Sequence, residues 1–173
     1  MREEITGKRV VRDMQKIARE QLNASGESCV TVGVRIKSGD LDGGRAKDGG
    51  VRACYYGISG RKGFQLLRDV LQAENVVTSG EELNELLDVF SATIVKYKSA
   101  TVGEAVQQRE LWKTHNCAES RLALYLLKHG IQLRNITIAS YGTDFGFKAP
   151  CDHCAQWVQQ NFQILPDYKK FSA

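Results

Sequence analysis

The chain has 173 residues and a formal net charge of +4. This length favours a single domain, residues 1–173, that can bury a sizeable core without disulfide or metal staples. No run of about 20 apolar residues is present, which excludes a membrane-spanning helix, and the mild positive charge permits nucleic-acid binding without requiring it.

The five cysteines bear on the compartment in which the protein acts. Their odd number argues against a disulfide framework and for a reducing environment such as a cytoplasm. Cys29 and Cys54 lie in apolar, strand-like runs, where a free cysteine is commonly a small buried hydrophobe. The sequence is charged from Arg2 onward and has no apolar targeting segment at its start.

The first third of the chain predicts one helix and two strands. Residues 5–23 repeat apolar side chains at helical spacing and predict an amphipathic helix. Residues 29–36 and 51–58 predict two strands. The connection 38–50 is rich in glycine but lacks the G-x-x-x-x-G-K-[ST] order of a phosphate-binding loop, which favours a mobile hairpin tip.

The middle of the chain, about residues 63–112, predicts a helical insertion. Apolar spacing indicates one helix around residues 64–71 and a second around residues 83–90. Residues 93–97 suggest a short strand, and residues 102–112 a third helical stretch. Because segments at the mouth of a pocket commonly set substrate choice, we expect specificity to lie in this insertion.

The last third predicts a nearly all-apolar helix and a core strand. Asn116 is the expected N-cap of this helix, Glu119 its third residue, and Gly130 its end. Asn-x-x-Glu is also close to a capping box, so a purely structural role for Glu119 stays open. Residues 135–141 predict a core strand, and Pro150 is expected to start another helix.

Two short stretches carry candidate metal ligands: Asn116-Cys117-Ala118-Glu119 and Pro150-Cys151-Asp152-His153-Cys154. Three thiolates can hold zinc while the fourth position keeps a water that the metal acidifies. Both stretches are predicted at helix N-termini, where the helix dipole and free amides lower thiol pKa values. We expect one Zn²⁺ per chain on Cys117, Cys151 and Cys154.

The order of these motifs resembles the cytidine deaminase-like superfamily over roughly residues 29–162. The resemblance implies an α/β fold, a three-layer α/β/α sandwich with a mixed sheet and a helical insertion before the zinc helix. It also implies that Glu119 takes a proton from zinc-bound water and passes protons to the base, so that cytosine becomes uracil and ammonia is released. Ser120 and Arg121 depart from the tetrameric members, which carry an arginine directly after the catalytic glutamate.

The resemblance also suggests residues that contact the substrate. In this family the second hairpin strand ends at the pocket, but the chain lacks the Asn and Glu with which free-nucleoside members grip the ribose. A simple turn there is the alternative. For the aromatic candidates, the sequence favours packing in the core over stacking on a base. The candidate substrate-binding residues are Gly57, Ser59, His115, Asn116, Ala118, Tyr141, Phe145 and Pro150.

The chain resembles the deaminase domains of bacterial polymorphic toxins in three features. It lacks the ribose-binding residues, it has an inserted helical segment, and it ends soon after Cys154. This implies delivery into a target cell as part of a larger toxin, neutralisation by an immunity protein, and single-stranded DNA or RNA as substrate. Two alternatives stay open. One is a free cytidine or nucleotide deaminase, favoured by the all-cysteine ligands, and the other is a non-catalytic, zinc-stabilised interaction module in which Glu119 is only a cap.

Overall fold

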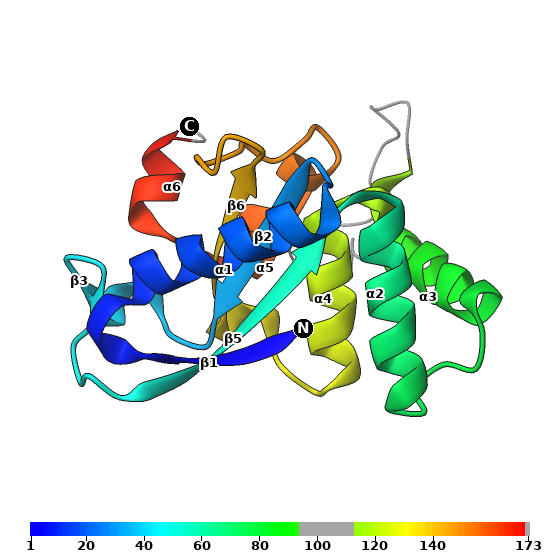
Figure 1. Ribbon diagram of the computed structural model, residues 1–173, viewed down its shortest axis with the longest axis horizontal. Coiled ribbons are helices and arrows are strands. Elements are labelled where there is room, and N and C mark those ends of the chain that lie inside the picture. Colours follow the sequence, from blue (N-terminus) through cyan, green and yellow to red (C-terminus); the bar gives the residue numbers. More distant parts are fainter. Residues whose placement is uncertain (94–112, 172–173) are drawn as a thin grey trace.

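The computed structural model describes residues 1–93 and 113–171 (Figure 1). The helical stretch predicted at residues 102–112 lies outside these ranges. The same holds for the strand predicted at residues 93–97, apart from Thr93, which is the last residue of a helix. In the described ranges, no helix is both long and apolar enough to cross a bilayer.

The centre of the fold is a mixed sheet with the strand order β1-β5-β2-β6-β7. All neighbouring strands run antiparallel except β6 and β7, which run parallel. The expected α/β class with a mixed sheet is therefore confirmed. The five strands are β1 (Arg2–Thr6), β2 (Cys29–Val34), β5 (Val51–Ile58), β6 (Thr137–Gly142) and β7 (Gln163–Ile164).

Helices cover both faces of this sheet, and each face has its own apolar core. On one face lie α1 and α6, and on the other α2, α3, α4 and α5 (Figure 1). The α-helices are α1 (Val10–Ser25), α2 (Gly60–Ala73), α3 (Gly80–Thr93), α4 (Ala118–Lys128), α5 (Val158–Asn161) and α6 (Pro166–Phe171).

Short elements complete the described chain. The glycine-rich connection between β2 and β5 folds into a small hairpin, as its composition suggests. The hairpin strands are β3 (Leu41–Asp42) and β4 (Arg45–Ala46). The 3-10 turns are η1 (Gly7–Arg9), η2 (Ser38–Asp40), η4 (Thr114–Asn116), η5 (Leu133–Asn135) and η6 (Cys154–Gln156).

The helix predicted at residues 5–23 begins later than its apolar spacing suggests. Ile5 is buried, as expected of an apolar position, but it lies in β1, which pairs with β5 and extends the sheet by one edge strand. The helix itself starts at Val10. The partner of β1 lies about 50 residues away in sequence, so a local periodicity does not reveal it.

The prediction that Pro150 starts a helix is wrong. Residues after Pro150 form a turn, and helical backbone begins only at Cys154. The amides of His153 and Cys154 donate to the Cys151 sulfur. Such local side-chain bonds offer the backbone an alternative to a helix, which explains the turn.

Candidate active site

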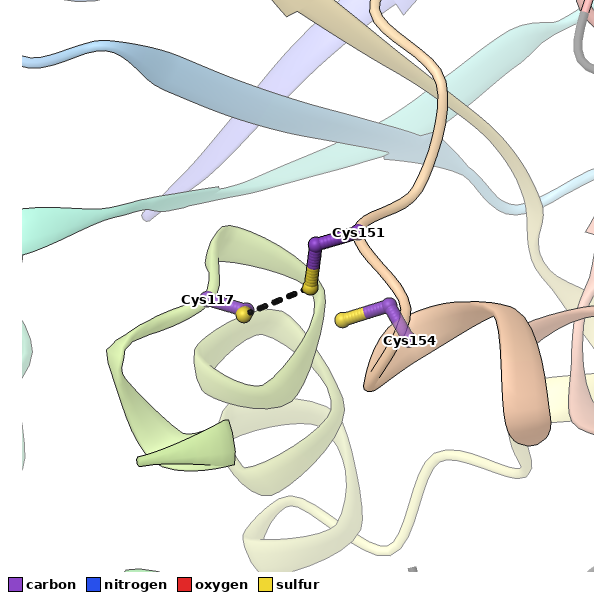
Figure 2. Close-up of side chains that lie close together, drawn as sticks. All are labelled: Cys117, Cys151 and Cys154. Atoms are coloured by element: carbon purple, nitrogen blue, oxygen red, sulfur yellow. Dashed lines mark hydrogen bonds between the residues drawn. The ribbon is translucent and has the colours of Figure 1, made fainter. Parts of the chain in front are cut away.

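The structure brings the three cysteines of the two motifs together. Cys117 is the N-cap of α4, a role that we expected Asn116 to fill, while Cys151 and Cys154 come from the turn after β6 and the start of η6. Their sulfur atoms all lie within 4.8 Å of one another, and the Cys117 and Cys151 sulfurs are 3.2 Å apart (Figure 2). Three sulfurs on one tetrahedral metal ion at about 2.3 Å would lie about 3.8 Å apart. The cluster therefore has the spacing of a metal site.

The chemistry of these donors also fits a metal ion. The hydrogen bond between Cys117 and Cys151 lowers the pKa of Cys151, helped by its amide donors, and raises the pKa of Cys117. Burial raises the pKa of Cys154, which has no exposed surface. Close-packed thiols of this kind can all ionise only beside a cation, and thiolates prefer soft metal ions.

Glu119 lies beside the thiols in the first turn of α4 and is only 3% exposed. Its Oε1 accepts a hydrogen bond from Ser140 at 3.0 Å, and Ser140 in turn lies 2.7 Å from the Thr31 hydroxyl. Its Oε2 is 3.4 Å from the Cys154 sulfur. Burial raises the pKa of Glu119, so this carboxyl can hold a proton at a higher pH than an exposed glutamate.

A cavity of about 720 Å³ opens onto this group. Cys117, Glu119 and Cys151 line it, so two of the three thiols and the carboxyl face the space that a ligand would occupy. Four of the predicted substrate-binding residues also line it: Ser59, His115, Asn116 and Ala118.

The other four predicted substrate-binding residues are not among the residues that line this cavity. Gly57 lies in β5 where α4 crosses it, and Pro150 directly precedes Cys151. Tyr141 is 1% exposed and belongs to the core beneath α1, on the opposite face of the sheet. Phe145 packs against that same core, beside Arg19 of α1.

His115 is buried and paired with a carboxylate, which its sequence context does not suggest. It is 8% exposed, and its Nδ1 lies 3.1 Å from an Asp88 carboxylate oxygen on α3. Burial lowers the pKa of His115, although Asp88 opposes this effect. His153 is fully buried, although its place inside the Cys-x-x-Cys loop suggests an exposed side chain.

Sequence reasoning missed the role of Arg121. This side chain is 1% exposed, and its guanidinium donates to the carbonyls of Ile58, Gly60 and His115. It therefore ties the end of β5 and the η4 turn to the start of α4. The available signal was a charged residue inside an otherwise apolar helix, because such a residue is buried only when it is paired.

Ser140 and Cys29 were also missed as site residues. Ser140 looks like an ordinary polar residue in the strand at residues 135–141, and its contact with Glu119 depends on how β6 packs against α4. Cys29 is buried, as predicted, but it also lines the cavity.

No protein-family model, curated protein or solved structure matches the chain. Function is therefore inferred from the site itself.

Proposed function

We propose that this protein is a zinc-dependent hydrolytic deaminase that converts cytosine to uracil and releases ammonia. One observation carries the proposal: Glu119 is buried between three converging thiols and a cavity of about 720 Å³. A carboxyl that only caps a helix requires neither a group of thiols nor a cavity beside it. The mixed sheet with helices on both faces suits the three-layer α/β/α sandwich of the cytidine deaminase-like type, which we include in the proposal.

We assign one zinc ion per chain to Cys117, Cys151 and Cys154. Thiolates select zinc over hard cations such as magnesium or calcium. When bound there, zinc would supply a water molecule whose pKa the metal lowers. Cys117 caps α4, so the positive end of the helix dipole favours its thiolate form.

Glu119 moves the protons in this proposal. The Ser140 hydroxyl holds its Oε1, which leaves Oε2 beside the thiols to accept a proton from water. The same carboxyl then donates to the ring nitrogen and to the leaving amine. Water and cytosine are consumed and uracil and ammonia formed, so the carboxyl ends the cycle as it began.

Side chains of the cavity wall could orient the base. Phe64 of α2 is partly buried there and offers an apolar ring face, while Asn84 and Asn116 offer amide groups. His115 lies at the same wall with its Nδ1 engaged by Asp88. A ring face and a few polar groups are the usual means of reading an extruded base.

We further propose single-stranded nucleic acid as the substrate and a toxin domain as the context. Residues 57–61, which run from the end of β5 into the start of α2, lack the ribose-binding Asn and Glu of free-nucleoside deaminases. Two exposed cations, Arg61 and Lys148, line the cavity instead and could meet backbone phosphates. A free cytidine or nucleotide remains the second candidate, because a cavity of about 720 Å³ is large enough to enclose one.

The test is a substrate panel read by mass. The zinc-loaded chain and its Glu119→Ala variant are incubated with single-stranded DNA, RNA, cytidine and CMP, and deamination is read as a gain of about 1 Da, because an amine is replaced by an oxygen. We expect conversion of a polymer by the wild type and none by the variant. Conversion of cytidine or CMP alone would select the second candidate. No conversion with zinc fully bound would overturn the deaminase proposal in favour of an interaction module.

A further inference from the structure

A cluster of positive charges lies at the N-terminal end of α1, far from the thiols. Lys8, Arg9, Arg12 and Arg45 are all exposed, and together they line a cavity of about 370 Å³ between α1 and the β3–β4 hairpin. In the part of the chain that the structure describes, no carboxylate forms an ion pair with any of the four. Their charges are therefore available to an anionic ligand.

The hairpin is fixed against the helix in a way that keeps this cluster together. The Gly44 carbonyl accepts a hydrogen bond from the Val11 amide at 3.2 Å, which ties the hairpin tip to the first turn of α1. Gly44 has a φ of 79°, a left-handed conformation that places Arg45 directly after a tight turn. The positive end of the α1 dipole lies at the same place, which adds to the attraction for phosphate.

Helix α1 leads from this cluster toward the candidate active site (Figure 1). Its 16 residues span roughly 24 Å, and Ser28, shortly after its end, lines the active-site cavity. Arg12, Lys16 and Arg19 are exposed at helical spacing along the way. Lys16 is partly neutralised by Glu20, whose carboxylate lies 3.8 Å from its Nζ.

The loop after β6 continues this path from α1 to the cavity. The Arg19 guanidinium lies 4.9 Å from the centre of the Phe145 ring, and Gln15 donates to the Phe145 carbonyl at 3.2 Å. Phe145 has a φ of 61°, which is uncommon for a residue with a side chain. Lys148, three residues further, lines the cavity and donates to the Ser28 carbonyl.

We propose that this face is a binding track for the phosphate backbone of single-stranded nucleic acid, which enters at the α1–hairpin cluster and reaches the cavity past Phe145. We define the track as Lys8, Arg9, Arg12, Arg19, Arg45, Phe145 and Lys148. A positive groove with an aromatic side chain along it is how sequence-tolerant proteins hold a single strand. That the track ends at the active-site cavity rests on the proposed function, but binding of a single strand to the track can be measured without any reaction.

The test measures binding of a labelled single-stranded oligonucleotide by fluorescence anisotropy over a range of salt concentrations. The full, zinc-loaded chain is used in the Glu119→Ala background, so that no turnover disturbs the measurement. Arg9→Gln/Arg12→Gln removes two charges from the track. Lys128→Gln/Arg134→Gln removes two exposed charges at the opposite end of α4 from Cys117 and is the matched control.

We expect the track variant to bind several-fold more weakly and to lower the slope of log affinity against log salt by about 1.4, because each phosphate contact with a single strand contributes about 0.7. The control variant should have the same affinity and salt slope as the Glu119→Ala parent. Circular dichroism should show that all three proteins are folded. Equal losses in both variants, no binding of the oligonucleotide, or binding to phosphatidylserine vesicles instead would each overturn the track. Tight, track-dependent binding, together with no deamination of any substrate by the zinc-loaded chain that keeps Glu119, would leave the track standing and refute the proposed reaction.

Discussion

Four acidic side chains are gathered in one small, largely buried volume: Cys117, Cys151, Cys154 and Glu119. Negative charges placed together away from water are unstable unless a cation compensates them. Arg121 of the same helix is also buried, but its hydrogen bonds go to backbone carbonyls. A metal ion would supply the missing positive charge, which is why the thiols and the carboxyl are best understood as one unit.

Ser140 gives a test of how precisely the Glu119 carboxyl must be held. Ser140→Ala removes the donor to Oε1, so the carboxyl can rotate away from its working position. We expect the kcat for deamination to fall about tenfold or more, the range seen when groups that orient a metal site are removed. Zinc content should stay at the wild-type level, as measured by elemental analysis.

The matched control for this prediction is Thr137→Val. Thr137 also lies in β6 and is fully buried, but its hydroxyl donates to the Ile36 carbonyl, away from Glu119. The Thr137→Val variant should have a lower free energy of unfolding than the wild type, but not the fall in kcat expected for Ser140→Ala. Wild-type turnover in Ser140→Ala, or an equal loss of kcat in both variants, would contradict the positioning role.

The candidate ligands could be predicted from the sequence because their chemistry lies in residue type and local spacing. Cys117 and Glu119 are two residues apart, and Cys151 and Cys154 are three apart. Ser140 could not be predicted, because its contact with Glu119 spans 21 residues and depends on packing between a strand and a helix. Only the three-dimensional arrangement reveals such partners.

Helix α4 is positioned by a close approach to the sheet. A Cβ on Gly57 of β5 would meet the Ala118 carbonyl and lie 2.7 Å from the Leu122 amide. A Cβ on Gly33 of β2 would lie 3.3 Å from the Leu122 side chain. Two glycines on neighbouring strands, offset by two residues in the register, thus allow the start of α4, with Cys117 as its cap, to sit deep against the strands.

This packing predicts a large effect of Gly57→Ala. The added methyl has no room because backbone atoms of α4 occupy its place, so the helix must shift. We expect the free energy of unfolding to fall by about 1–3 kcal/mol, as in overpacked cores, and the affinity for zinc to fall because Cys117 moves with α4. Urea denaturation and a zinc-binding titration measure the two effects.

Gly39→Ala is the control for this substitution. Gly39 is exposed, and nothing would lie within 4 Å of its added Cβ. Its unfolding free energy and zinc affinity should match those of the wild type. If Gly57→Ala is equally harmless, then α4 does not depend on this close approach.

The elements themselves were predictable to different degrees. The strand at residues 51–58 has the predicted bounds because its apolar run is local and long. The first helix was extended too far toward the N-terminus, since Ile5 fits a helical period although it pairs in a sheet. At Cys151 the sequence predicts a helix because Pro150 suits a helix start, but hydrogen bonds to the Cys151 sulfur, which the sequence does not reveal, favour a turn.

The site joins segments that are far apart in the chain. Cys117 and Cys151 are separated by 34 residues, and β6 lies between them in sequence. Thr31 of β2 lies next to Ser140 of β6 because these strands pair in the sheet. The sheet therefore assembles the site, and a metal ion on three thiols would cross-link α4 to the segment after β6.

Native mass spectrometry of the reduced, full chain shows whether the three thiols hold a metal ion. We predict one zinc ion per chain in the wild type and its loss in Cys117→Ser and in Cys154→Ser. Cys54→Ala should keep its zinc, because Cys54 is buried in the core beneath α1 and does not belong to the thiol cluster. A wild-type chain that binds no zinc with all five cysteines reduced, or a Cys117→Ser variant that keeps its zinc, would contradict the account.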